Sequence, residues 1–173
     1  MLSPAFKLYL FIIIIGISTI SCGYRPLLSS SRKVDVLYLP VVINGTSYSN
    51  IASQLTTMLR GEIRSSGIGI HEHKQKNAWG LSVKIAGVRG SSDAIKIKSG
   101  EELPVTALWR IDAMVTLFKP DGNMQIKPTL VTVQDVAPAG DNLNSELLQQ
   151  ERTRSALLER LAKKITFMIL QVQ

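Results

Sequence analysis

The sequence LWRIDAMVTLFKPDGNMQIKPTLVTVQDV, residues 108–136, carries the clearest fold signal of the chain. Apolar and polar residues alternate over residues 108–119 and again over residues 125–136. Pro120-Asp121-Gly122-Asn123 between these stretches is a turn sequence. Alternation at period two on both sides of such a turn predicts an antiparallel hairpin with one buried face. Pro128 lacks a backbone N–H, so we expect an edge position or a bulge where it interrupts the returning strand.

Upstream of this hairpin, the pattern predicts two more strands with a helix between them. Residues 34–43 and 79–86 alternate as strands, and the helix is expected between Asn50 as N-cap and Gly67 as the stop. Residues 67–73 can follow as a short extended piece. Four residues of the first strand are expected to share one face: Leu37, Leu39, Val41 and Ile43.

Downstream, apolar residues recur at helical spacing from Leu147 to Val172 and predict a second, longer helix. Ile111 of the hairpin and Leu158 of this helix are expected to point into one core. Residues 89–104 predict a long charged loop or a protruding extension of a hairpin. The fold class is therefore α+β, a two-layer sandwich in which two helices cover a four-stranded mixed sheet, in the order strand, helix, three strands, helix.

The first residues of the chain have the three parts of a bacterial secretory signal. In residues 1–21 one lysine precedes an apolar block, and small or polar residues separate that block from Cys22. The block is shorter than the roughly 20 residues that a membrane-spanning helix needs. The end of the leader resembles a lipobox, whose cysteine is acylated, although Thr19 stands where leucine is usual. The alternatives are an ordinary cleaved signal with a chance cysteine, or an uncleaved anchor.

Lipidation of Cys22 would explain a lone cysteine in an exported chain. An acylated cysteine leaves no thiol for a disulfide or a thiolate metal site. Residues 22–33 are polar and turn-prone and predict a lipid-anchored tether, followed by a single α/β sandwich domain over residues 34–173. The net charge of +7 indicates anionic partners, either a phosphorylated glycolipid or the membrane surface. We expect no nucleic acid partner after export and no cofactor.

Three short stretches resemble the LPS-assembly lipoprotein (LptE) family. They are Cys22-Gly23-Tyr24, the strand end from Leu39 to Thr46, and the helix start from Ile51 to Thr56. The family has a lipidated Cys-Gly-aromatic sequence, then a V-x-x-F-x-N-x-T strand end and an L-x-x-x-L-T helix. The chain departs from this pattern at Pro40 and Val42 and lacks the usual aspartate at the start of residues 77–85.

The resemblance implies a small sandwich that sits in the lumen of the LptD outer-membrane barrel. A protein of this family supports assembly of that barrel and helps pass lipopolysaccharide to the cell surface. Gly23 after the cysteine implies an outer-membrane address, with the domain in the periplasm or the barrel lumen. The alternative is a periplasm-facing lipoprotein adaptor, such as a lipid-binding auxiliary subunit of an envelope transporter; a lipid-anchored hydrolase is a remote third.

Five cations are candidate ligands for lipopolysaccharide phosphates. Lys96 and Lys98 are two residues apart in an extended stretch, with Arg89 nearby in sequence, and clustered cations bind phosphates. Lys119 and Lys127 flank the hairpin turn and would extend this patch if that end of the sheet lay beside the 89–104 loop. The alternative is a solvated loop that only keeps the protein soluble.

The remaining candidate groups favour a protein that is not an enzyme. His71 and His73 share a strand face in the predicted extended piece, but no third metal ligand is evident. Acids of the charged loop offer a possible acid/base pair, with no nucleophile or burying pocket beside them. They are Asp93, Glu101 and Glu102. We therefore expect no catalytic residues and no metal site.

Overall fold

The computed structural model describes residues 34–93, 106–138 and 143–172. These residues belong to one unit, Lys33–Gln173. The predicted signal peptide, the tether and Cys22 lie outside the described residues. The elements are β1 (Val36–Tyr38), β2 (Ile43–Asn44), α2 (Ile51–Ser65), β3 (Gly69–His71), β4 (Trp79–Asp93), β5 (Thr106–Phe118), β6 (Met124–Pro138) and α3 (Leu143–Leu170).

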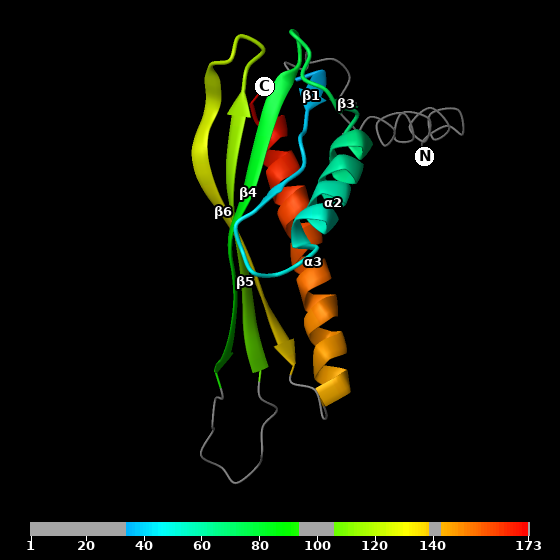
Figure 1. The fold of residues 1–173 in the computed structure, drawn as a ribbon, viewed down its shortest axis with the longest axis vertical. Coiled ribbons are helices and arrows are strands. Elements are labelled where there is room, and N and C mark those ends of the chain that lie inside the picture. The colour runs from blue at the N-terminus through cyan, green and yellow to red at the C-terminus, as the bar shows by residue number, and fades with distance from the viewer. Residues whose placement is uncertain (1–33, 94–105, 139–142, 173) are drawn as a thin grey trace, which may run out of the picture. The chain divides into compact units, whose positions relative to one another are not determined.

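The strands form one mixed sheet, in the order β3-β1-β4-β5-β6, and β2 also pairs with β4 (Figure 1). The strands β4, β5 and β6 form an antiparallel meander, whereas β1, β2 and β3 make parallel pairs. The α+β class, the mixed sheet and the two helices agree with the prediction, but the sheet has six strands and not four. The two additional strands come from residues 34–43, which form two strands, and from residues 69–71, which pair with β1.

The predicted strand over residues 34–43 is divided at Pro40, and its alternation does not continue through the break. Leu37 and Leu39 are buried as expected, but Val41 is 66% exposed and Val42 is buried in its place. The Val42 N–H donates to the Thr56 hydroxyl at 3.0 Å, a side-chain partner in α2. Proline and this hydrogen bond shift the pleat, so the expectation that Val41 and Ile43 share a face with Leu37 and Leu39 was wrong.

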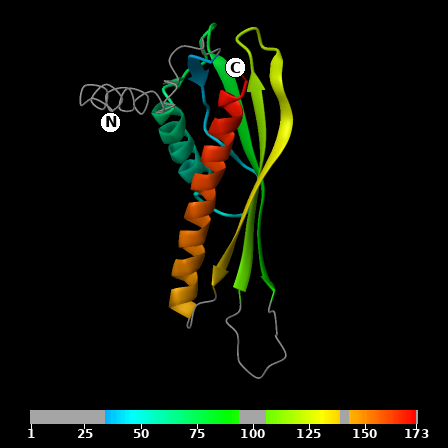
Figure 2. The same cartoon turned by 180° about the vertical axis from the view of Figure 1, so that it is seen from behind.

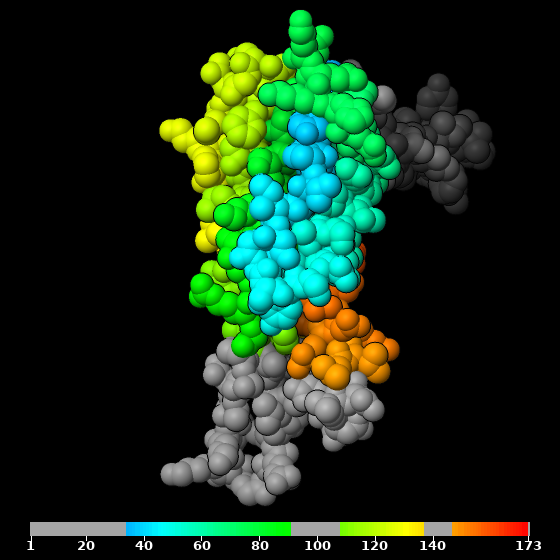
Figure 3. All heavy atoms as spheres, in the orientation of Figure 1, coloured from blue at the N-terminus to red at the C-terminus, as the bar shows by residue number. Residues whose placement is uncertain are grey.

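Both helices pack on the same face of the sheet and contact each other (Figure 2). Their buried stripes meet the inward residues of β4, β5 and β6 in one apolar core. Ile111 and Leu158, the predicted core pair, are both 0% exposed. Figure 3 shows the segment from β1 to α2 lying along β4, with which β1 and β2 are paired.

The predicted ends of α2 are right in position and differ in detail, whereas α3 spans Leu143–Leu170 and not residues 147–172. Asn50 precedes α2, but its backbone is left-handed and its side chain makes no capping hydrogen bond. Gly67 has the positive φ that suits a helix stop. Leu147 of α3 is 52% exposed, because its part of the helix precedes the buried stripe that begins at Leu157.

The predicted hairpin between β5 and β6 is confirmed. Gly122 has a φ of 86°, and the Lys119 N–H donates to the Asn123 carbonyl at 2.8 Å. β6 is the last strand of the sheet, and its register with β5 shifts between Thr129 and Ile126. Pro128 therefore has both features expected of it, an edge strand and a bulge. None of the helices in the described part of the chain has the length and apolarity that a membrane span requires.

Candidate functional site

One face of the sheet carries no helix among the described residues, and we call it the helix-free face. It is defined by residues in register across four strands: Ile43, Lys84, Met114 and Leu130. Their neighbours along the strands point the other way, into the core: Ile85, Ala113 and Val131. Because side chains alternate between the two faces of a strand, this register settles which residues face outward.

Apolar side chains gather on the helix-free face. The register places Met124 opposite Phe118 and Val136 opposite Leu108 on this face. Ile43, Met124, Leu130 and Val136 are each exposed by half or more. Single exposed apolar residues are common on protein surfaces, whereas several on one face indicate a contact with a partner or ligand. The face is also basic, since Lys84 is exposed in the same row as Ile43.

A buried carboxylate lies at the middle of this face. Asp112 accepts hydrogen bonds from Arg110 Nε at 2.9 and 3.2 Å and from the Thr132 hydroxyl at 2.6 Å. Burial alone would raise the pKa of Asp112. The hydrogen bonds from Thr132 and Arg110, with the positive charges of Arg110 and Arg89, outweigh burial and hold that pKa below its ordinary value. Asp112 is therefore ionised and links β5 to β6.

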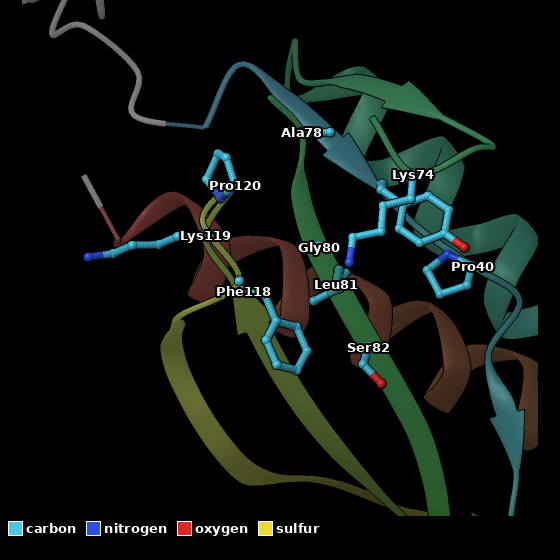
Figure 4. Close-up of a pocket in the computed structure, with 11 residues that line it drawn as sticks. Pro40, Lys74, Ala78, Gly80, Leu81, Ser82, Phe118, Lys119 and Pro120 are labelled. Atoms are coloured by element: carbon cyan, nitrogen blue, oxygen red, sulfur yellow. The ribbon is translucent and has the colours of Figure 1, made fainter. Parts of the chain in front are cut away.

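A pocket of about 330 Å³ opens at one end of the helix-free face (Figure 4). Its centre is Gly80 of β4, which stands in register between Tyr38 of β1 and Phe118 of β5. The two aromatic rings therefore flank a position that has no side chain. Ser82, the next outward residue of β4, also lines the pocket and is small. The result is a slot along β4 with largely apolar walls.

Two lysines line the same pocket but point in different directions. The Lys74 side chain extends over the pocket toward Gly80, whereas the Lys119 side chain points away from it (Figure 4). Lys119 lowers the pKa of Asp121 through its charge, after the larger effect of hydrogen bonds from Asn123. Lys74 forms no ion pair with any residue in the described part of the chain. Its ammonium group is available to an anion in the slot.

The structure separates the predicted phosphate-binding cations. Arg89 stands opposite Arg110 in β4 and β5, while Lys119 directly follows the end of β5, nine residues beyond Arg110. At about 3.4 Å per residue this is roughly 30 Å along the strand. Arg89 and Lys119 therefore lie toward opposite ends of the β4–β5 pair and do not form one continuous patch. Lys127 is exposed near the same end as Lys119; Lys96 and Lys98 lie outside the described residues.

The candidate metal and acid/base groups are only partly described. β3 ends at His71, so His73 does not share its strand face, and His71 lies 3.3 Å from the Gln75 side-chain amide. Over residues 34–93, 106–138 and 143–172, no three potential ligands are grouped around a metal position. Asp93 is the last residue of β4, and Glu101 and Glu102 lie outside the described residues.

Sequence reasoning did not identify the pocket. Alternation over residues 79–86 puts Gly80 on the face opposite the apolar Leu81 and Val83, and a glycine inside a strand is a signal of a close approach or a gap. The sequence does not show that Tyr38 and Phe118 flank Gly80. Their positions depend on the parallel pairing of β1 with β4 and the antiparallel pairing of β5 with β4. Lys74 reaches the slot from the loop after β3, which no local pattern places there.

Comparisons with known proteins bear on the fold. The sequence matches no protein-family model and no curated protein. A minor lipoprotein from Acinetobacter baumannii shares the fold at 16% identity and a TM-score of 0.58, over 80% of this chain and 92% of that chain. A putative lipoprotein from Caulobacter crescentus does so at 11% identity and a TM-score of 0.50, over 80% and 89%. A hypothetical protein from Chlamydia trachomatis follows at 7% identity and 0.52, over 79% and 98%.

At these identities the similarity concerns the fold alone. The sandwich of this chain is thus a fold that bacterial lipoproteins also have, and it extends over most of their length. What those proteins bind is not part of this similarity.

Proposed function

We propose that the chain is an outer-membrane lipoprotein, anchored through Cys22, that supports assembly of an LptD-type barrel and assists lipopolysaccharide transport to the cell surface. The observation that carries the proposal is the fold, which matches a bacterial lipoprotein over 80% of this chain. The lipobox-like leader and the Cys22-Gly23-Tyr24 sequence support it independently. The protein has no catalytic role in this proposal. The buried carboxylate of Asp112 stabilises the sheet by linking β5 to β6.

The helix-free face suits contact with a barrel wall. Its exposed side chains Ile43, Leu130 and Val136 are apolar and point away from the core. Covering such side chains with a partner removes apolar area from water, which stabilises the complex. We therefore expect a large β-barrel to co-purify in stoichiometric amounts after mild detergent extraction. Leu130→Asp is expected to reduce this co-purification, while Ser155→Asp, at an exposed position of α3 away from this face, serves as the control.

A second candidate function is favoured by the pocket at Gly80. A periplasm-facing lipoprotein adaptor that binds a lipid for an envelope transporter would use such a slot. The same extraction separates the two functions, because an adaptor of this kind co-purifies with an inner-membrane ATPase complex. Recovery of the chain with neither partner would contradict both.

The anchor is tested by Cys22→Ala. No other residue of the chain can form the thioether, so labelling with a clickable fatty acid is expected to disappear in the variant. Two or three acyl chains give durable membrane attachment, so the variant is also expected to leave the membrane fraction or to stay unprocessed. Undiminished labelling of the variant would disprove lipidation at this residue.

Lipopolysaccharide binding is tested by neutralising the two separate groups of cations in two variants. One variant neutralises Arg89, Lys96 and Lys98, and a second neutralises Lys119 and Lys127 at the other end of the sheet. If the first group contacts phosphates, only the first variant loses affinity for purified lipopolysaccharide in calorimetric titration. Affinity should fall with salt, because exposed charges are screened over about 8–10 Å at physiological ionic strength. Equal affinity of both variants and the parent chain would mean that the cations only solvate the surface.

A further inference from the structure

The slot over Gly80 is formed by strand register and not by a flexible loop. Tyr38, Gly80 and Phe118 occupy one row across β1, β4 and β5. Adjacent strands are about 4.8 Å apart, so the two aromatic residues start about 10 Å from each other. The gap between them is one side chain wide, because Gly80 contributes none. Tyr38, Gly80 and Phe118 therefore belong to the sheet, whereas Pro40 and Lys74 line the slot from segments between strands.

The slot combines apolar walls with one available cation. Tyr38, Pro40 and Phe118 provide apolar surface, and Lys74 extends over the slot toward Gly80 (Figure 4). Lys74 has no ion-pair partner within the described ranges, which leaves its ammonium group free to bind an anion. A volume of about 330 Å³ is near the lower end of the roughly 300–1,000 Å³ range of ligand pockets. The occupant is therefore small or narrow.

We propose that this pocket binds a single-chain anionic amphiphile, with its alkyl chain over Gly80 between Tyr38 and Phe118 and its anionic head on the Lys74 ammonium group. The lysine ammonium group acts as a point charge, so it binds either a carboxylate or a phosphate. The head is therefore that of a medium-chain fatty acid or of an alkyl phosphate. The proposal does not depend on the barrel-supporting function, since it rests on residues of one pocket.

Two substitutions probe the slot, and each has a matched control. Gly80→Val places a side chain in the slot, and its Cβ would meet Phe118 at an ordinary 3.6 Å. Gly87→Ala is its control on the same strand, where a Cβ would meet only the Asp112 carboxylate at 3.9 Å. Lys74→Ser removes the cation from the slot. Lys119→Ser is its control, because Lys119 lines the pocket but points away.

The experiment uses the full chain in its membrane, with a photoreactive medium-chain fatty acid, a photoreactive alkyl phosphate and a photoreactive neutral alkanol as probes. Mass spectrometry of the cross-linked peptides is expected to place the anionic probes in β4 near Gly80 and in β5 near Phe118. Gly80→Val is expected to abolish this labelling while the melting temperature stays equal or rises, since valine favours strands. Lys74→Ser is expected to reduce it about tenfold, the usual effect of a charge-assisted contact.

The two controls should label as the parent chain does. Stronger labelling by the fatty acid or by the alkyl phosphate identifies the head group that the pocket prefers. Three results would overturn the proposal: labelling that avoids the slot, labelling of Gly80→Val at the parent level, or equal labelling by the neutral alkanol.

Discussion

On β6, Val131 and Leu130 are neighbours in the chain, yet their side chains meet different surroundings. Val131 is 4% exposed beneath the helices, and Leu130 is 50% exposed on the helix-free face. The same contrast holds across the sheet, where β5 alternates between fully buried residues such as Ile111 and residues that face outward such as Met114. One face is a closed apolar core, and the other combines apolar side chains, lysines and a slot.

The difference separates what holds the fold together from what is available for recognition. Burial of apolar area beneath α2 and α3 stabilises the fold and needs only side chains of suitable size and shape. The helix-free face gains little stability from its exposed residues. Its fixed features, the Asp112 network and the slot at Gly80, depend instead on particular residues in register.

The largest effect is expected from a charge placed in the core. Ile111→Asp and Leu158→Asp each put a carboxylate where the parent side chain is 0% exposed. An unpaired buried charge costs several kcal/mol, comparable to the total stability of about 5–15 kcal/mol of a small domain. Both variants should lack a cooperative thermal transition in circular dichroism. Gln134→Asp, on the exposed side of β6, should melt with the parent chain; a normal melt of Ile111→Asp would reverse our assignment of the two faces.

The sequence predicted the covered face better than the helix-free face. Periodicity identified the inward residues Ile111 and Leu158, the two helices and the hairpin, because burial on one face produces a regular pattern along the chain. Pro128 identified the edge strand for a direct physical reason, its missing N–H. These features depend on local sequence.

The features that the sequence missed depend on pairing between distant segments. Alternation predicted that Val41 shares a face with Leu37 and Leu39, but Pro40 and the hydrogen bond from Val42 to Thr56 shift the pleat. The slot at Gly80 requires three strands in register, and no single strand shows it. The separation of Arg89 from Lys119 follows from the length of β5, and the sequence predicted one patch only on the condition that these two ends were adjacent. The proposed site therefore comes from the structure, and the family resemblance from the sequence.

The contact of Gly45, directly after β2, with β4 gives the next largest effect. A Cβ on Gly45 would lie 2.5 Å from the Ile85 carbonyl oxygen, to which the Gly45 N–H donates at 3.0 Å. Gly45→Ala is therefore expected to separate β2 from β4 and to cost about 1–3 kcal/mol in chemical denaturation. Gly61→Ala in α2 meets open space and should instead stabilise by about 0.5–1 kcal/mol. Equal stabilities of the two variants would show that β2 is not held against β4.

An effect of similar size, which also depends on pH, is expected on the helix-free face from Asp112. Its pKa is lower in the folded than in the unfolded chain, so its contribution to stability is complete above the unfolded value of about 3.9. That contribution is lost as the pH falls through the folded value. Asp112→Asn keeps the shape but loses the charge-assisted hydrogen bonds, at a cost of about 1–3 kcal/mol near neutral pH. The stability difference between the parent chain and the variant should shrink in acid; a difference that stays constant with pH would show that the ionised form of Asp112 is not what matters.

The smallest effect on stability is expected at Leu130, the exposed neighbour of the buried Val131 on β6. Leu130→Asp places a carboxylate on an exposed position of β6, so water solvates the charge and the free energy of unfolding should change by no more than about 0.5 kcal/mol. Val131→Asp, one residue further along, buries the same group beneath the helices and should cost several kcal/mol. Denaturant titration followed by the fluorescence of Trp79 and Trp109 compares the two directly. A large loss of stability in Leu130→Asp would mean that another part of the chain covers this face, which would leave it unavailable to a partner and remove the physical basis for its contact with a barrel wall.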